Sequence, residues 1–225
     1  MNQAGSLALV AALAFAAYAV IAGAVSGKLR SMRVLKSAER ATLAFCVMIT
    51  LGVAALEYLI LTDNFHSAYV ASHSNRALPV YYKLPVLWAG QEGSLLFWTW
   101  LLAIYSALAV LLNRRKNRQL MPFVVSITMA TGVFFSVLIN FIANPFSGLS
   151  LASAGGTRAF TPPDGSGLNP SLQYPSMVIH PPMLYLGYVG FSSRSPSPWR
   201  RSRPSSPATT GFALRGAGRW SPGCS

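Results

Sequence analysis

The chain contains 225 residues, of which 18 are Lys or Arg and 5 are Asp or Glu, so its formal net charge is +13. Charged residues make up 10% of the sequence, far below the roughly 25% that is usual in soluble domains, and apolar residues make up 52%. This composition excludes an ordinary soluble enzyme and a wholly disordered chain. It indicates a protein with several membrane spans.

Four apolar stretches are long enough to cross a membrane, because about 20 residues at 1.5 Å each span the ~30 Å hydrocarbon core. The first stretch lacks the basic residues that begin a signal peptide, so we interpret it as a transmembrane helix. A fifth apolar stretch is shorter. The predicted fold is all-α, a polytopic helical membrane protein with spans at about 6–25, 41–62, 94–113 and 121–143 and a truncated fifth at 178–191.

Basic residues gather in two of the loops between these spans. Loop 28–40 holds five and loop 113–120 holds four, whereas loop 63–93 holds two and loop 144–177 holds one. Because Lys and Arg near membrane spans favour the cytoplasm, we expect the first two loops to be cytoplasmic and the N-terminus to be outside. The three histidines then fall on the outer side: His66, His73 and His180.

The outer loop 63–93 is too aromatic for a plain solvated loop. It leads into the third span through Trp88 and Glu92, and Trp98 follows. Such aromatic residues are typical of an interfacial belt, and they also fit a surface for a flat apolar ligand or a partner. Glu92 lies at the mouth of the span, where an acid stabilises a helix N-terminus by roughly 0.3–1 kcal/mol. Composition alone does not separate these interpretations.

Other polar residues also allow a structural and a functional interpretation. Glu57 lies in the second span near its outer end, where it either reaches the interface or pairs inside the bundle. His66 and His73 are seven residues apart, but no Cys or acid at ligand spacing completes a metal site, so we expect none. Cys46 and Cys224 form no disulfide framework, and Cys46 is expected to be a small core residue.

His180 lies in the sequence Y-P-S-M-V-I-H-P-P-M-L-Y. Proline pairs break a helix on their N-terminal side and suit its first turn, so Pro181 and Pro182 place His180 at the head of the fifth span, on the outer face. A neutral imidazole there is a candidate ligand to haem iron or another metal. The alternative is that His180 caps the helix start or faces the lipid headgroups.

Two segments resemble a known family: L-P-V-Y-Y-K-L-P-V-L-W-A-G-Q-E-G-S-L-L-F-W at 78–98, and G-L-N-P-S-L-Q-Y-P-S-M-V-I-H-P-P-M-L-Y-L-G-Y-V-G-F at 167–191. With H-S-N-R-A-L-P at 73–79, they are similar to the N-terminal third of the CcmF-type haem lyases, a cytochrome c-type biogenesis family that includes NrfE and CcsA. The resemblance covers most of residues 1–191 in span order.

This resemblance implies a part in cytochrome c-type biogenesis in the bacterial inner membrane. Family members receive haem from the haem chaperone CcmE and attach its vinyl groups to the C-x-x-C-H cysteines of an apocytochrome c, alongside other membrane proteins of cytochrome c maturation. By match, haem b is the substrate and His180 a candidate axial ligand. The matched segments also supply a candidate haem or partner surface: Trp88, Glu92 and Trp98. No catalytic residue, and no metal other than haem iron, is assigned.

The chain also departs from this family. It lacks the W-G-G-x-W-x-W-D haem platform, the other outer histidine and the pair of membrane histidines, and it is far shorter. A single axial ligand holds haem weakly. We therefore expect a truncated form that is inactive alone and does not retain haem.

Residues 192–225 differ abruptly from the rest, with nine Ser, six Arg, five Pro and four Gly and no acid. Such a segment is predicted to be disordered, because it cannot bury a core. Codons for S-V-P-F-A-F-A-M-A-A-L that lose one G encode S-S-R-S-P-S-P-W-R-R-S, the sequence of 192–202. We interpret the tail as out of frame, and a basic linker is the alternative.

Two other functions remain open from the residues alone. A transporter fragment would use Glu57 and the Pro-interrupted span as its site. A small membrane adaptor would bind anionic lipid or nucleic acid through the basic tail. The matched motifs favour the haem lyase family, with membrane lipid and no nucleic acid as a partner.

Overall fold

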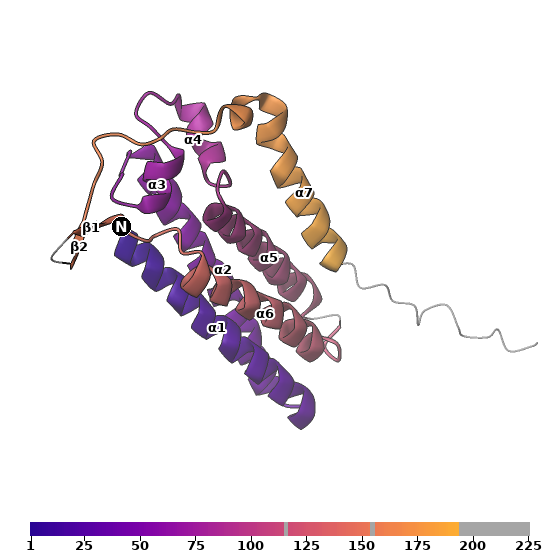
Figure 1. The fold of residues 1–225 in the computed structure, drawn as a ribbon. Coiled ribbons are helices and arrows are strands. Elements are labelled where there is room, and N and C mark those ends of the chain that lie inside the picture. Colours follow the sequence, from indigo (N-terminus) through magenta and orange to yellow (C-terminus); the bar gives the residue numbers. More distant parts are fainter. Residues whose placement is uncertain (115–116, 154–155, 194–225) are drawn as a thin grey trace, which may run out of the picture. The chain divides into compact units, whose positions relative to one another are not determined.

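The computed structural model describes residues 1–114, 117–153 and 156–193. Within these ranges four helices are long and apolar enough to cross a membrane, and they lie side by side as a bundle (Figure 1). They are α1 (Asn2–Leu29), α2 (Met32–Leu61), α5 (Gln91–Asn113) and α6 (Met121–Val137), the last continued by the π-helical turn η1 (Leu138–Ile142). The prediction of a helical membrane protein with four spans is confirmed.

Small residues on α1 allow its neighbours α2 and α6 to approach closely. Ala12, Ala16 and Ala19 recur at helical spacing and are fully buried. A Cβ atom on Gly23 would lie 2.5 Å from the Ser126 hydroxyl oxygen of α6. Because lipid tails are as apolar as the helices, close packing of this kind is what holds membrane helices together.

The predicted loop 28–40 is almost entirely helical. α1 ends at Leu29 because Arg30 adopts the left-handed conformation (φ 49°), and α2 begins at Met32 after the extended Ser31. The loop prediction was wrong because Lys, Arg and Glu are good helix formers, so charge alone does not end a helix that leaves the membrane. The bases instead project from two helix ends.

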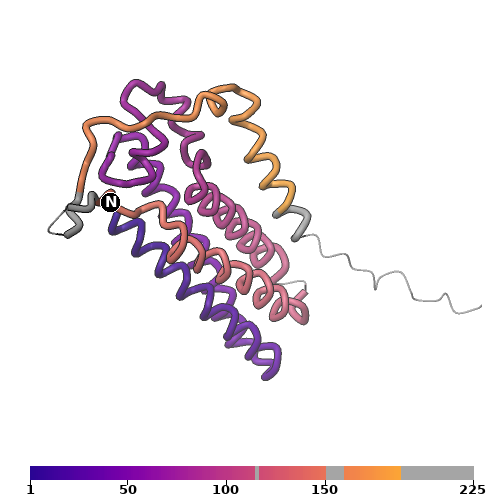
Figure 2. The backbone as a smooth tube through the Cα atoms, in the orientation of Figure 1, coloured from indigo at the N-terminus to yellow at the C-terminus, as the bar shows by residue number. Residues whose placement is uncertain are grey.

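The segment 63–93 contains two short helices that its composition did not predict, α3 (Ala68–His73) and α4 (Val80–Val86). The chain that follows η1 passes over α3 (Figure 2). The Ser166 N–H donates to the Ala71 carbonyl oxygen at 2.8 Å, and the Gly167 N–H donates to the Ser74 carbonyl oxygen at 3.1 Å. These bonds attach the two long loops to each other at one end of the bundle, which we name the α3 end.

The rest of the segment 144–177 holds little regular structure. It contains the antiparallel hairpin of β1 (Ser150–Ser153) and β2 (Gly156–Ala159) and the 3₁₀ turn η2 (Pro170–Gln173). The Asn169 side chain caps η2 by accepting from the Ser171 N–H at 3.0 Å.

The helix at the predicted fifth span is α7 (Pro175–Ser193). It contacts α5 and η2 and lies at the edge of the bundle (Figure 1). The helix begins at Pro175 and not at the predicted Val178. A residue in the first turn of a helix needs no backbone N–H group, so a proline can begin the helix there. His180 is therefore the sixth residue of the helix, and Pro181 and Pro182 lie inside it. Beyond Ser193, the prediction for the tail 192–225 falls outside the described residues.

Candidate functional site

Tyr69 organises the α3 end of the bundle. Its side chain is buried, and its hydroxyl donates to the Val86 carbonyl oxygen at 2.6 Å and accepts from the Gly90 N–H at 3.1 Å. Burial raises the pKa of Tyr69, the Gly90 N–H acts in the opposite direction, and the nearby Glu92 charge raises it further. The neutral phenol therefore fixes the junction between α4 and α5.

Two glycines at this junction are required by close approach to Tyr69 and His73. The His73 ring stacks on Tyr69 with centroids 4.6 Å apart, and a Cβ on Gly90 would lie 2.5 Å from its Nε2 atom. A Cβ on Gly93 would collide with the Leu87 carbonyl oxygen and the Tyr69 hydroxyl. The spacing of glycines in the W-A-G-Q-E-G motif thus follows from packing around one buried tyrosine.

An aromatic cluster joins α5, α6 and α7 near this junction. The ring of Trp98 lies 5.2 Å from Phe135 on α6 and 5.5 Å from Tyr185 on α7, between ring centroids. Phe97 lies 5.3 Å from Trp88 and 5.9 Å from Tyr185. These distances are typical of favourable aromatic pairs. The predicted surface residues Trp88 and Trp98 are therefore both partly buried members of one cluster that holds α7 against α5.

His180 is exposed, five residues before Tyr185 on the same helix. Five residues correspond to about 140° around a helix, so the imidazole lies well away from the face that carries Tyr185. In the part of the chain that the structure describes, His180 forms no hydrogen bond or ring contact with Trp88, Glu92 or Trp98. The packing of Tyr185 nevertheless fixes the helix from which the His180 side chain projects.

The N-cap residue of α5 is Gly90, which has no side chain to cap the helix, and Glu92 lies in the first turn. Its charge can still favour the positive end of the helix. Glu57 does not reach the surface: both its carboxylate oxygens are buried, and in the described part of the chain they have no hydrogen-bond partner. Of the two interpretations of Glu57, the structure excludes interfacial exposure and shows no paired group.

His66 and His73 do not form a common site. His66 Nδ1 lies 3.0 Å from the Thr161 hydroxyl, whereas His73 Nδ1 lies 3.0 Å from the Tyr69 carbonyl oxygen. No group of three or more His, Cys, Asp or Glu residues suited to a metal ion occurs in residues 1–114, 117–153 and 156–193.

An ion pair at the α3 end was missed from the sequence. Lys83 of α4 is buried, and its Nζ atom donates to both Asp63 carboxylate oxygens, at 2.6 and 2.7 Å. Asp63 follows the last turn of α2 in the left-handed conformation (φ 51°). A lysine inside the apolar stretch L-P-V-Y-Y-K-L-P-V was the available signal, since a buried ammonium group requires a partner.

The structure is that of a helical membrane protein with four candidate spans, a tightly packed α4–α5 junction and a further helix that carries His180. Residues 88–195 match the family model of the cytochrome c assembly protein. The resemblance drawn from the sequence motifs is confirmed.

Individual relatives are more specific. The chain is 36% identical to the cytochrome c-type biogenesis protein CcmF of Haemophilus influenzae over 193 residues, which cover 85% of this chain and 28% of that protein. It is 37% identical over 148 residues to NrfE of the same organism, covering 66% and 22%. A solved structure of the cytochrome c haem lyase CcmF is similar with a TM-score of 0.68 and 26% identity, over 85% of this chain and 28% of that one. The chain thus spans about a quarter of the length of these relatives.

Proposed function

We propose that this chain is an N-terminal part of a CcmF-type protein of cytochrome c-type biogenesis. The observation that carries the proposal is the family match of residues 88–195, which begins at Trp88 and includes the whole of α5 and α7. In the whole protein, haem b is the substrate, received from the chaperone CcmE and ligated to apocytochrome c. The 225-residue chain spans too little of its relatives to perform this reaction alone or to retain haem.

His180 is the residue that we assign to haem in this proposal. It is exposed, so its imidazole can reach a large planar ligand without rearrangement of the core. The Phe97–Tyr185 and Trp98–Tyr185 contacts hold its helix against α5. Haem iron needs a held nitrogen donor, and holding the haem also fixes the vinyl groups for attack by the thiols.

The experiment is His180→Ala in the frame-restored, full-length protein, with His66→Ala as the matched control. Both histidines are exposed. We expect His180→Ala to lower the haem that co-purifies and the yield of covalent cytochrome c, with membrane insertion intact and partial rescue by imidazole. His66→Ala should retain parental values. Parental yield and an unchanged haem spectrum in His180→Ala would refute the assignment.

We also propose that the chain lies in the bacterial inner membrane with its N-terminus outside. The supporting observation is that Lys28, Arg30 and Arg33 gather where α1 ends and α2 begins. In a variant without native cysteines, Ser72→Cys should react with an impermeant thiol reagent from the periplasm, and Gln119→Cys should not. The reverse labelling pattern contradicts the orientation.

For the tail, we propose that residues 192–225 are translated out of frame. The family match that ends at residue 195 supports this, because it stops close to the change in composition. Resequencing the DNA around codon 192 tests it. An intact reading frame, with no family sequence downstream in the alternative frame, favours the basic linker.

A further inference from the structure

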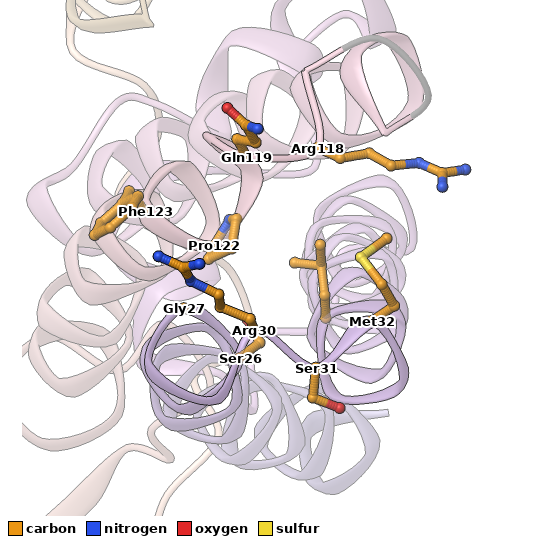
Figure 3. Close-up of a pocket in the computed structure, with 10 residues that line it drawn as sticks. Ser26, Gly27, Arg30, Ser31, Met32, Arg118, Gln119, Pro122 and Phe123 are labelled. Atoms are coloured by element: carbon orange, nitrogen blue, oxygen red, sulfur yellow. The ribbon is translucent and has the colours of Figure 1, made fainter.

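The end of the bundle opposite the α3 end contains a cavity of about 500 Å³. It lies between the end of α1, the start of α2 and the start of α6, and we name this the turn end. Figure 3 shows that Arg30 extends from the end of α1 towards Pro122, while the Arg118 side chain points away from Arg30. Met32, Leu35 and Phe123 add apolar surface to the lining.

A second cavity of about 350 Å³ adjoins the first, since Met32, Leu35 and Arg118 line both. Its other charged lining residues come from α2 and from the end of α5: Lys36, Glu39, Arg40 and Arg114. Glu39 interacts electrostatically with Arg114, Arg118 and Lys36, so these charged side chains lie close enough to influence one another. Both volumes fall in the range of about 300–1,000 Å³ that is usual for small-molecule sites.

The linings of the two cavities carry more positive than negative charge. Five exposed basic residues line the two cavities, with Glu39 as the acid among them: Arg30, Lys36, Arg40, Arg114 and Arg118. In the part of the chain that the structure describes, none of these five forms a salt bridge. α2 and α6 begin at these cavities whereas α1 and α5 end there, so the partial charges of the helix ends offset each other and the positive excess comes from the basic side chains. The site therefore favours an anion.

The position in the membrane selects the kind of anion. The bases lie at the ends of four membrane-spanning helices, which is the level of lipid headgroups. Apolar side chains beside them suit the upper part of an acyl chain, which a soluble phosphate or nucleotide lacks. Arginine guanidinium groups match phosphate oxygens in two-point hydrogen bonds.

We propose that the two cavities at the turn end bind the phosphate headgroup of an anionic phospholipid, with Arg30 lining the first cavity and Arg118 lining both. Basic pockets between membrane helices are a known type of site for such headgroups. The proposal depends on the spans and on these linings, and not on haem chemistry.

The test is native mass spectrometry of the full chain in detergent with added phosphatidylglycerol or phosphatidylethanolamine. We expect preferential retention of phosphatidylglycerol, lowered about five-fold for each base removed in Arg30→Gln and Arg118→Gln, since about 1 kcal/mol per base near an anionic surface corresponds to that factor. Arg33→Gln is the matched control, because Arg33 is exposed on α2 and lines neither cavity.

Three results would overturn the proposal. The first is equal retention of the two lipids by the parental chain. The second is an equal loss in Arg33→Gln, which shows attraction by net charge without a site. The third is displacement of phosphatidylglycerol by millimolar inorganic phosphate at unchanged ionic strength, which shows a site for free phosphate instead of lipid. Parental thermal stability of the variants confirms that they are folded.

Discussion

Removing the partner of Lys83 should be among the most damaging single changes at the α3 end. In Asp63→Asn the buried ammonium group loses its counter-charge but keeps one oxygen acceptor. Asparagine tolerates the left-handed backbone that Asp63 adopts, so the change isolates the charge. Breaking a buried ion pair on one side typically costs 3–5 kcal/mol.

The exposure of each partner sets the expected magnitudes. The Lys83 side chain is 6% exposed, whereas that of Asp63 is 25% exposed. A lone ammonium at Lys83 therefore cannot reach water, and we expect Asp63→Asn to lower the free energy of unfolding by about 3 kcal/mol. A lone carboxylate at Asp63 can be hydrated, so Lys83→Met should cost only about 1 kcal/mol.

The assay is equilibrium unfolding in mixed detergent and dodecyl sulfate, followed by tryptophan fluorescence. The double variant Asp63→Asn/Lys83→Met completes the cycle, and its loss should be close to that of Lys83→Met alone, because no unpaired buried charge remains. If Lys83→Met costs as much as Asp63→Asn, or if the two losses simply add, the reasoning from burial is refuted.

Three further outcomes are expected. Gly93→Ala should lower the free energy of unfolding by about 1–3 kcal/mol, because the added Cβ meets the Leu87 carbonyl oxygen. The control Gly187→Ala on α7 has open space around it and should cause no such loss. Equal losses in the two variants would contradict the packing argument. The backbone N–H of Arg76 is the main cause that holds the pKa of Asp164 below its ordinary value, so this contact contributes stability above about pH 4 and loses it as pH falls through the folded pKa. Amide exchange at Arg76, corrected for intrinsic rates, should rise in acid in the parental chain and show no such transition in Asp164→Asn. In a strain without the haem lyase, the 225-residue chain should give no covalent cytochrome c, and any recovery disproves its inactivity.

Composition and the length of the apolar stretches were sufficient for the spans. A membrane helix must satisfy every backbone group internally, so 20 or more apolar residues leave little choice of structure. This is why the positions of α1, α2, α5 and α6 agree with the prediction to within a few residues at most ends. The start of α2 does not agree, because four of its first nine residues are charged but still favour a helix.

The site was only partly predictable. The sequence by itself determined the number of spans, the end of the bundle that carries the basic residues, and the place of His180 beside a proline pair. Only the tertiary structure decided that Trp98 contacts α7 while Trp88 contacts Phe97 of α5, and that Lys83 pairs with Asp63. It also decided that the Glu57 carboxylate oxygens are buried without a hydrogen-bond partner in the described residues. Helix formation depends on neighbours along the chain, whereas the burial and pairing of a polar group depend on residues that are distant in sequence and meet only when the loops dock.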